Sequence, residues 1–354
     1  MKTAVVILNW NTREYLRRWL PSLLSGDADV WVADNASADG SLEMVRESFP
    51  EVRTIGFDDN YGFTGGYNRA IDAVSKAADY RYAVLLNSDV DVQKGWLEPL
   101  EEWMDSHPEC GICGPKILAM DPSGERTGRF EYAGGAGGYL DRFGYPFCRG
   151  RVMKRTELDE GQYDTPREVM WISGACLMTR MSLWRDLGGL DDRFFAHMEE
   201  IDYCWRAQLA GWKVTEVPYS SVWHLGGGTL PQDSPFKLKL NFRNNLLLLD
   251  NNLEATIHAS GGRSWRAKCR ITFRRMLDII SAAVYLIKGR KDLAGAVADA
   301  HREFKGLREM PRRTAVHPEQ GAVPAGLLDL CIVPLAALKG NRIFKYLRQY
   351  ENSH

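Results

Sequence analysis

Short apolar runs alternate with amphipathic segments along the first part of the chain. Strands are predicted at residues 5–8, 30–33, 52–55 and 82–86, and the apolar, β-branched run at 5–8 is typical of a strand covered on both faces. A helix is predicted after the first run, because apolar residues recur every three or four positions from Tyr15 to Leu24 and residues 11–14 resemble a capping box. A second helix is predicted after the glycine-rich segment 62–66. This repetition with short connections predicts a parallel, doubly wound α/β sheet.

The pattern changes in the middle of the chain. Residues 134–150 are rich in glycine and aromatic residues and predict a loop with a hairpin, and residues 169–179 predict a strand. A helix is expected over 199–210, ended by Gly211, before two short strands at 212–217 and 220–224. The pattern from residue 235 onward is helical. A boundary near Gly261 predicts a first domain over 1–261, with parts 1–120 and 121–261, and a helical C-terminal region over 262–354.

Composition and charge narrow the class of protein. The chain has 354 residues, 45% of them hydrophobic, and a formal net charge of -1, which gives the whole molecule no electrostatic reason to bind nucleic acid. The first residues have too short an apolar run for a signal peptide. No stretch approaches the about 20 apolar residues of a spanning helix, so we expect the protein to lie in the cytoplasm. The seven cysteines are scattered, and we expect Cys110 and Cys113 to be buried free thiols rather than zinc ligands.

Polar residues end several of the predicted strands. Asn9, Asp34 and Asn87 each follow an apolar run, and in such sheets ligands bind at the carboxyl ends of the strands. Asp89 and Asp91 come next, and residues two apart in an extended segment share a face. Carboxylate oxygens suit Mg²⁺ or Mn²⁺, and such ions bridge phosphates. The alternative is that these acids are solvated turn residues.

Three further sites in the sequence could take part in ligand binding or catalysis. The carboxylate of Asp34 could accept the N3–H of a uracil or thymine ring, or could cap the next helix. Glu199, Glu200 and Asp202 open a predicted helix, where they either complement the helix dipole or supply a general base. His224 precedes Gly226-Gly227-Gly228; glycines let backbone approach a phosphate closely, and imidazole suits Mn²⁺.

Several other enzyme classes lose support. The chain has no GxGxxG or Walker A segment, which disfavours dinucleotide-dependent dehydrogenases and P-loop enzymes. It has no GxSxG elbow, which disfavours an α/β-hydrolase.

A set of short segments in fixed order resembles the family 2 glycosyltransferases of GT-A fold. The segments are VVILNWN at 5–11, VADNASADGS at 32–41, NYGFTGGYN at 60–68, LLNSD at 85–89, WISGA at 171–175, EEID at 199–202 and VWHLGG at 222–227. The resemblance covers about residues 1 to 230 and is greatest to the rhamnosyltransferase-like branch that builds bacterial cell-surface polysaccharides. It implies a Rossmann-like, mostly parallel sheet flanked by helices, with a helical C-terminal extension.

The resemblance also implies roles for individual residues. Asp34 would bind the donor base, with Asn9 and Asn11 nearby, and the metal would be held by Asp89 and His224. Glu200 would be the general base, with Glu199 beside it and Asp202 as a further candidate. The remaining implied donor-site residues are Gly66, Asn68, Asn87, Ser88, Gly174 and Ala175.

Two positions depart from the family pattern. The first acid of the family's DxD is Asn87 here, so metal binding could recruit Asp91. The family's Glu-Asp pair is Glu199-Glu200 here, which leaves the choice of base between these two residues open.

The expected reaction moves a sugar, with inversion, from a nucleotide diphosphate donor to a hydroxyl of a glycan or lipid-linked acceptor with Mn²⁺ or Mg²⁺. By family analogy the donor is dTDP-rhamnose. The alternatives are a UDP-hexose-dependent glycosyltransferase, a sugar-phosphate nucleotidyltransferase and an inactive nucleotide-sugar binding protein. The basic stretch from Arg263 to Lys291 predicts either peripheral docking on the anionic inner face of a membrane or a helix packed on the catalytic domain with a solvated basic edge.

Overall fold

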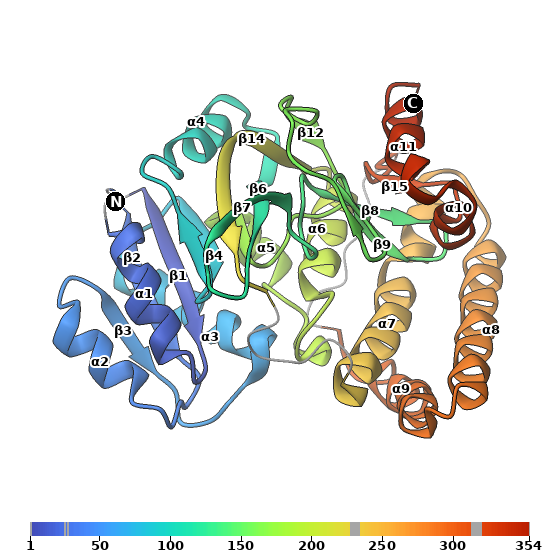
Figure 1. Ribbon diagram of the computed structural model, residues 1–354, viewed down its shortest axis with the longest axis horizontal. Helices are drawn as coiled ribbons and strands as arrows, with labels where there is room; N and C mark the ends of the chain where they lie inside the picture. The colour runs from blue at the N-terminus through green and yellow to red at the C-terminus, as the bar shows by residue number, and fades with distance from the viewer. Residues whose placement is uncertain (1, 25, 27, 227–233, 313–320, 354) are drawn as a thin grey trace.

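The amino-terminal strands form the parallel half of a ten-stranded sheet (Figure 1). The computed structural model describes residues 2–24, 26, 28–226, 234–312 and 321–353. Its parallel strands lie in the order β3-β2-β1-β4, with bounds β1 (Thr3–Asn9), β2 (Asp29–Asp34), β3 (Arg53–Gly56) and β4 (Tyr82–Asn87). Asn9 pairs with Asp34, and Leu8 pairs with Asn87. The polar residues that end these strands therefore share one edge of the sheet.

Beyond β4 the sheet becomes mixed. The strands β6 (Cys110–Met120) and β13 (Cys176–Arg180) are antiparallel to each other, β13 is antiparallel to β4, and β14 (Lys213–His224) runs parallel to β6. The short strands β5 (Val90–Val92) and β12 (Arg167–Glu168) pair with β14, and β7 (Arg126–Phe130) pairs with β6. The two strands predicted at 212–217 and 220–224 are one strand, β14, whose pairing with β6 shifts register between Glu216 and Ser221. The break predicted between these two strands falls at this register shift, inside a single strand.

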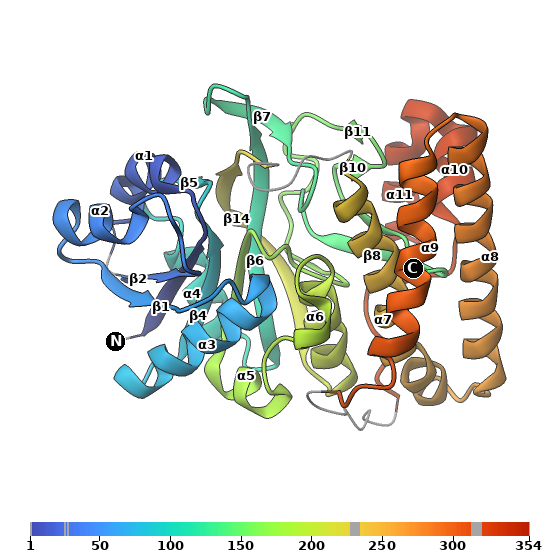
Figure 2. The same ribbon diagram turned by 90° about the horizontal axis from the view of Figure 1, so that it is seen from below.

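Helices cover both faces of this sheet (Figure 2). One face packs against α1 (Arg13–Leu23), α2 (Ser41–Ser48) and α4 (Glu98–Ser106), and the other against α3 (Gly62–Ala77), α5 (Met181–Leu187) and α6 (Glu199–Leu209). In β1, Val5 and Ile7 join the first layer while Ala4 and Val6 join the second, because successive side chains of a strand point to opposite faces. Burial on both faces explains the uninterrupted apolar runs in the sequence.

The capping box predicted at 11–14 is not formed. The N-cap of α1 is Thr12, which makes no side-chain cap hydrogen bond, and Asn11 has a φ of 54°. The backbone N–H of Arg13 instead donates to Asp39 Oδ2 at 2.9 Å. An acid distant in sequence therefore caps the helix.

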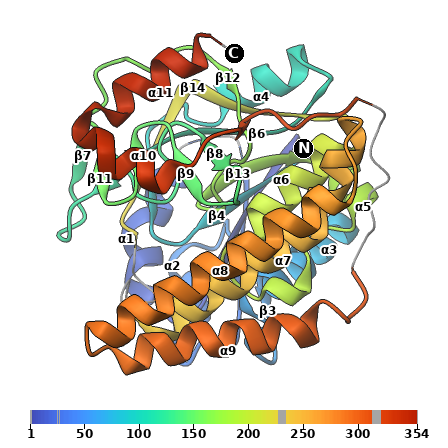
Figure 3. The ribbon, with the colours of Figure 1, turned by 90° about the vertical axis from the view of Figure 1, so that its right-hand side faces the viewer.

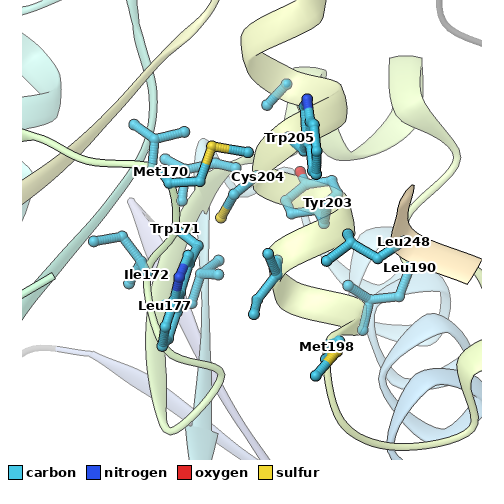
Figure 4. Close-up of a cluster of buried hydrophobic side chains, with 14 of the residues drawn as sticks. Met170, Trp171, Ile172, Leu177, Leu190, Met198, Tyr203, Cys204, Trp205 and Leu248 are labelled. Atoms are coloured by element: carbon cyan, nitrogen blue, oxygen red, sulfur yellow. The ribbon is translucent and has the colours of Figure 1, made fainter. Parts of the chain in front are cut away.

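Helix α6 lies in the largest apolar cluster, which is drawn in Figure 4. Tyr203, Cys204 and Trp205 of α6 are fully buried, and Leu248 of α7 (Pro235–Ala259) packs beside them. The indole N–H of Trp205 donates to Thr256 Oγ1 at 2.8 Å. These contacts fix the helix whose first turn carries the acidic residues 199, 200 and 202.

The C-terminal part is helical, as predicted, and Figure 3 views it from the side. Its helices are α8 (Trp265–Ile287), α9 (Lys291–Leu307), α10 (Ile332–Lys339) and α11 (Ile343–Glu351), and α7 packs against both α8 and α9. The hairpin predicted within 134–150 is formed by β8 (Gly138–Asp141) and β9 (Pro146–Cys148). They belong to a second sheet with β10 (Arg151–Val152), β11 (Arg155–Thr156) and β15 (Leu327–Leu328). Because β15 pairs with β8, a segment after residue 261 shares a sheet with a segment before residue 261. The predicted boundary between a first domain and a C-terminal region near Gly261 stays a prediction.

Candidate active site

The first cluster of site residues lies at the ends of β1 and β2. Asn9 is fully buried and donates from Nδ2 to Asp34 Oδ1 at 2.6 Å, and its Oδ1 accepts from Thr12 Oγ1 at 2.5 Å. Asp34 Oδ2 accepts from the N–H of Ser37 at 3.0 Å. The side chain of Asn9 therefore does not face solvent, and its hydrogen bond holds Asp34 in place. Each oxygen of Asp34 has one of these partners and retains capacity to accept a further hydrogen bond.

Asn11 belongs to the same corner. Its backbone N–H donates to Ser37 Oγ at 2.8 Å, and its Oδ1 accepts from the N–H of Ala38 at 2.8 Å. Asn11 thus ties the end of β1 to the turn after β2, and both of the segments predicted to hold the donor base form one hydrogen-bonded unit.

The glycines at the start of α3 allow it to pack closely on β1. A Cβ at Gly66 would lie 2.7 Å from the side chain of Leu8 and 3.0 Å from Asn35 Nδ2. The predicted donor-site residue Asn68 is turned the other way. Its Nδ2 donates to the carbonyl of Leu190 at 2.9 Å and to Asp192 Oδ1 at 2.7 Å. Asn68 therefore braces the segment before α6, and we no longer assign it to the donor.

A second cluster gathers around His224, at the end of β14. His224 Nε2 lies 3.1 Å from Asp89 Oδ1 and 3.4 Å from Asn87 Nδ2, and His224 Nδ1 lies 3.5 Å from Glu131 Oε1. Burial opposes a charge on the ring, but Asp89 and Glu131 outweigh it and hold the pKa of His224 well above its usual value. Burial likewise opposes the charge of Asp89, yet His224 holds the pKa of that carboxyl below its usual range. Gly227 and Gly228, which follow, lie outside the described residues.

Asp91 does not join this cluster. The chain turns at Ser88 and Asp89 before β5 begins, so the expected alternation of an extended segment does not apply. In β5, Asp91 pairs with Trp223, and its Oδ2 accepts from Arg126 Nε at 2.7 Å. The expectation that Asp91 would share a face with Asp89 is therefore wrong, and Asp91 serves as the partner of Arg126.

A third cluster is the acidic start of α6. Glu199 is 3% exposed and Glu200 is half-buried, and each has an Oε2 that is buried without a hydrogen-bond partner among the described residues. Burial raises the pKa of Glu200 to about 7. Burial and the neighbouring Glu200 raise the pKa of Glu199 well above its usual value. Near neutral pH, Glu200 is thus divided between its two forms.

Asp202 has a structural environment. It is 0% exposed, and its Oδ2 accepts from Arg206 Nε at 2.7 Å. Its Oδ1 accepts from the side-chain amides of Asn251 and Asn252 at 3.0 and 2.8 Å. A carboxylate so enclosed cannot reach an acceptor hydroxyl, so we withdraw Asp202 as a candidate base.

The loop before α6 has an unusual backbone. Phe195, His197 and Met198 have φ angles of 65°, 70° and 72°, a conformation that costs on the order of 1–3 kcal/mol at a residue other than glycine. Asn244 Nδ2, on α7, donates to the carbonyls of Ala196 and His197 at 2.7 and 2.6 Å, and Arg243 Nη2 donates to that of Phe194 at 2.6 Å. Strained backbone held by buried side chains is typical of functional sites.

Direct contacts join the three clusters. Thr12 Oγ1 lies 2.8 Å from Ser88 Oγ and can accept its hydrogen, which links the first cluster to the second. The N–H of Asn87 donates to the carbonyl of Ala175 at 3.0 Å. A Cβ at Gly174 would lie 3.0 Å from the ring of Phe63 and 3.8 Å from Glu200 Cβ, so Gly174 links the second cluster to the third. Gly174, Ala175 and Ser88 thus lie at the links between the clusters, and their assignment to the donor site stays a prediction.

The second cluster fits a divalent ion in part. Asp89 Oδ1 and His224 Nε2 lie together, and Glu131 stands behind the other ring nitrogen, as carboxylates do that orient a metal-binding histidine. Among the described residues, no group of three His, Cys, Asp or Glu side chains is arranged to hold a metal ion. Such ions commonly take one or two protein ligands and complete their shell with substrate phosphates and water. Asp89 and His224 fit that pattern.

Two residues of the site were missed in the sequence. Glu131 follows β7 in a stretch without regular pattern, and only the fold brings it to His224. Lys237 lies in the first turn of α7, where burial lowers its pKa and the charge of Glu131 opposes that effect. Burial, with the charge of Lys237, lowers the pKa of His197 to about 4. Lys237 follows His224 and the glycines at 226–228 closely in the sequence, and this proximity was the available signal for a cation near the site.

Comparisons with known proteins indicate the family of this chain. Residues 4–185 match the family described as Glycosyl transferase family 2. An N-acetylglucosaminyl-diphospho-decaprenol L-rhamnosyltransferase of Mycobacterium tuberculosis is 28% identical over 78% of this chain and 91% of its own length. The rhamnosyltransferase WbbL of Escherichia coli is 23% identical over 60% of this chain and 80% of its own.

The solved structures bear on the fold. GalNAc-T7 with UDP, GalNAc and Mn²⁺ aligns with a TM-score of 0.54 at 18% identity, over 74% of this chain and half (50%) of that one. TarS of S. aureus with UDP-GlcNAc aligns with a TM-score of 0.50 at 15% identity, over 86% and 92% of the two chains. The predicted GT-A fold is confirmed, as is the prediction of a transferase. With the match to residues 4–185, these findings establish that the chain is a glycosyltransferase that belongs to glycosyl transferase family 2.

Proposed function

We propose that this enzyme transfers rhamnose from dTDP-rhamnose, with inversion, to a hydroxyl of a lipid-linked glycan in the synthesis of a cell-surface polysaccharide. The names of two relatives, the rhamnosyltransferases of M. tuberculosis and E. coli, support the sugar, and that of the mycobacterial enzyme supports a lipid-linked acceptor. The observation that carries the proposal is the series of neighbours that leads from the Asp89–His224 pair through Asn87 and Ala175 to Gly174 and Glu200, because it supports a metal-binding pair and a carboxylate base in one site.

Glu200 is the general base in this proposal. It has a buried oxygen without a partner and a pKa raised by burial to about 7, so a useful fraction is ionised at neutral pH and its proton affinity suits a reaction near pH 7. Glu200 takes the proton of the acceptor hydroxyl as that oxygen attacks the anomeric carbon. Burial and the neighbouring Glu200 raise the pKa of Glu199, which disfavours two negative charges on the pair.

Asp34 binds the base of the donor nucleotide by accepting the N3–H of thymine. Uracil presents the same N3–H, so this contact alone does not separate dTDP from UDP donors. Asp89 and His224 would hold Mn²⁺ or Mg²⁺, and such an ion would supply positive charge for the donor diphosphate. Lys237 adds a cation on the side of Glu131 and His197. The basic C-terminal region supports a location at the anionic inner face of the membrane.

A donor panel tests this function. The purified chain is incubated with dTDP-rhamnose, UDP-glucose and UDP-N-acetylglucosamine, with a polyprenyl-diphosphate-linked N-acetylglucosamine acceptor and either Mn²⁺ or a chelator. We expect release of dTDP and a rhamnosylated product of inverted anomeric configuration only when metal is present. A faster turnover of a UDP-sugar would show that dTDP-rhamnose is not the preferred donor. Product formation in the presence of the chelator would show that transfer does not need a metal ion.

A further inference from the structure

Helix α8 has one face that anchors it to the protein. Arg274 Nε lies 2.9 Å from Asp278 Oδ1, and both side chains are buried. Asp278 Oδ2 lies 3.1 Å from His301 Nε2 of α9, and Arg274 Nη1 donates to Asn245 of α7. This face contains the single acidic residue of the helix, so no carboxylate of α8 is left for the outer side.

The outer face of α8 is apolar from end to end. Of the 19 large hydrophobic side chains that are exposed in the described part of the chain, eight lie on this helix: Trp265, Phe273, Met276, Ile279, Ile280, Val284, Leu286 and Ile287. Ile279 is 64% exposed and Ile287 is 86% exposed. At about 3.6 residues per turn these side chains fall on one side of the helix. Figure 3 views the molecule from the side where α8 lies along the surface. A contiguous apolar surface of this kind marks an interaction site.

Basic side chains border this apolar face. Lys268 and Arg275 lie along one edge and Arg266 along the other when positions are counted at about 100° per residue, and all three are exposed. Lys288 follows at the C-terminal end and is also exposed. An apolar stripe with lysine and arginine at its margins is the pattern of a helix that lies flat in the interface of an anionic bilayer.

Charge decides between a membrane and a second copy of the chain as the occupant. Two copies of α8 packed face to face would bring basic edges together without acidic partners, and like charges across an interface are unfavourable. Anionic lipid headgroups complement the same edges. No helix of the described residues is long and apolar enough to span a membrane, so α8 would lie on the surface and not cross it.

We propose that the outer face of α8 docks the enzyme on an anionic membrane, with its apolar side chains below the headgroups and its basic edges on the lipid phosphates. Helix α7 connects this face to the candidate base. Asn245 accepts from Arg274 of α8, while the adjacent Arg243 and Asn244 hold the loop that precedes Glu199. Docking therefore fixes the orientation of the catalytic acids relative to the bilayer. That consequence rests on the proposed function, whereas the docking itself does not.

Vesicle co-sedimentation of the full chain tests the proposal. Wild type is compared with I280E/I287E, with K268E/R275E and with the charge-matched control R17E/K94E, whose exposed residues lie on other elements. On vesicles of phosphatidylcholine and phosphatidylglycerol at low salt, wild type and the control are expected to pellet. The loss of each basic residue weakens binding about fivefold, so K268E/R275E should bind at least about 25-fold more weakly. I280E/I287E should stay in the supernatant, and salt should weaken wild-type binding.

A loss of vesicle binding can be distinguished from misfolding and from a loss of catalytic activity. The substituted side chains are exposed, so unfolding temperatures should match that of wild type. Transfer to a water-soluble acceptor analogue should also be unchanged, while transfer to an acceptor embedded in vesicles should fall with binding. The proposal is overturned if wild type stays in the supernatant, or if I280E/I287E binds as wild type does. It is also overturned if light scattering finds a wild-type dimer that I280E/I287E dissociates.

Discussion

Replacing Glu200 with glutamine removes the proposed base with little change in shape. The substitution retains the size of the side chain at the start of α6 and places a neutral amide where wild type has a carboxyl of pKa about 7. Because the buried oxygen has no partner among the described residues, little structure is lost with it. The expected effect is therefore on the chemical step and not on folding.

The magnitude follows from the role and from the pKa. General-base catalysis contributes about 10²–10⁴-fold, which corresponds to about 3–5 kcal/mol of barrier, so Glu200→Gln should lower kcat by that factor. In wild type, the base is the ionised form, and with a pKa of about 7 it is about one tenth populated at pH 6 and about nine tenths at pH 8. The kcat of wild type should therefore rise with pH through about 7 and then level off.

Single-turnover rates with saturating donor measure this step, and Glu199→Gln is the matched control. Burial and Glu200 raise the pKa of Glu199 and so favour its neutral form, which glutamine resembles, so this variant should retain most of the wild-type rate. Its pH profile should stay close to that of wild type, because burial and not a charge on Glu199 raises the pKa of Glu200. A Glu200→Gln rate within about threefold of wild type at pH 8, far from the loss expected of a base, would refute the assignment, and a wild-type rate that is independent of pH would do so as well.

Three further substitutions separate the roles of the other residues. Asp89→Ala should abolish the stimulation of transfer by Mn²⁺, and a preserved Mn²⁺ titration would contradict its role. Asn244→Ala should lower kcat by about tenfold with an unchanged donor KM, because a misplaced base loses positioning; an equal effect on donor KM would assign the loss elsewhere. Asp202→Ala leaves Arg206 buried without its partner and should lower the free energy of unfolding by about 3–5 kcal/mol, as measured by urea denaturation; an unchanged stability would contradict its structural role.

The fold could be predicted to a large extent because its signals are local. The apolar runs of β1, β2 and β4 and the glycine-rich start of α3 are each contiguous in sequence, and each reflects a buried strand or helix. The mixed half of the sheet was harder, since β14 bends at a bulge and pairs with β6 and β5 across long stretches of chain. Register shifts of this kind are set by tertiary packing, which short-range patterns do not record.

Some residues of the candidate site could likewise be predicted from local sequence patterns, and others could not. Asp89 and His224 were paired from separate motifs and lie 3.1 Å apart. Asp91 was grouped with Asp89 by an alternation rule, and the rule fails because the chain turns between β4 and β5. Asp202 shares the first turn of α6 with Glu199 and Glu200, but its carboxylate is enclosed by Arg206 and by two asparagines of α7, which no local pattern records.

The asparagine at position 87 is consistent with the charges around His224. Asn87 lies 3.4 Å from His224 Nε2, beside Asp89 and with Glu131 across the ring, so two carboxylates already face one imidazole. A third carboxylate at position 87 would add negative charge to a buried cluster, which costs free energy whenever no cation is bound. A neutral amide keeps an oxygen available to an ion without that cost. The protein then contributes fewer charges to the metal, so the diphosphate of the donor must supply the others, and we expect metal and donor to bind together rather than in sequence.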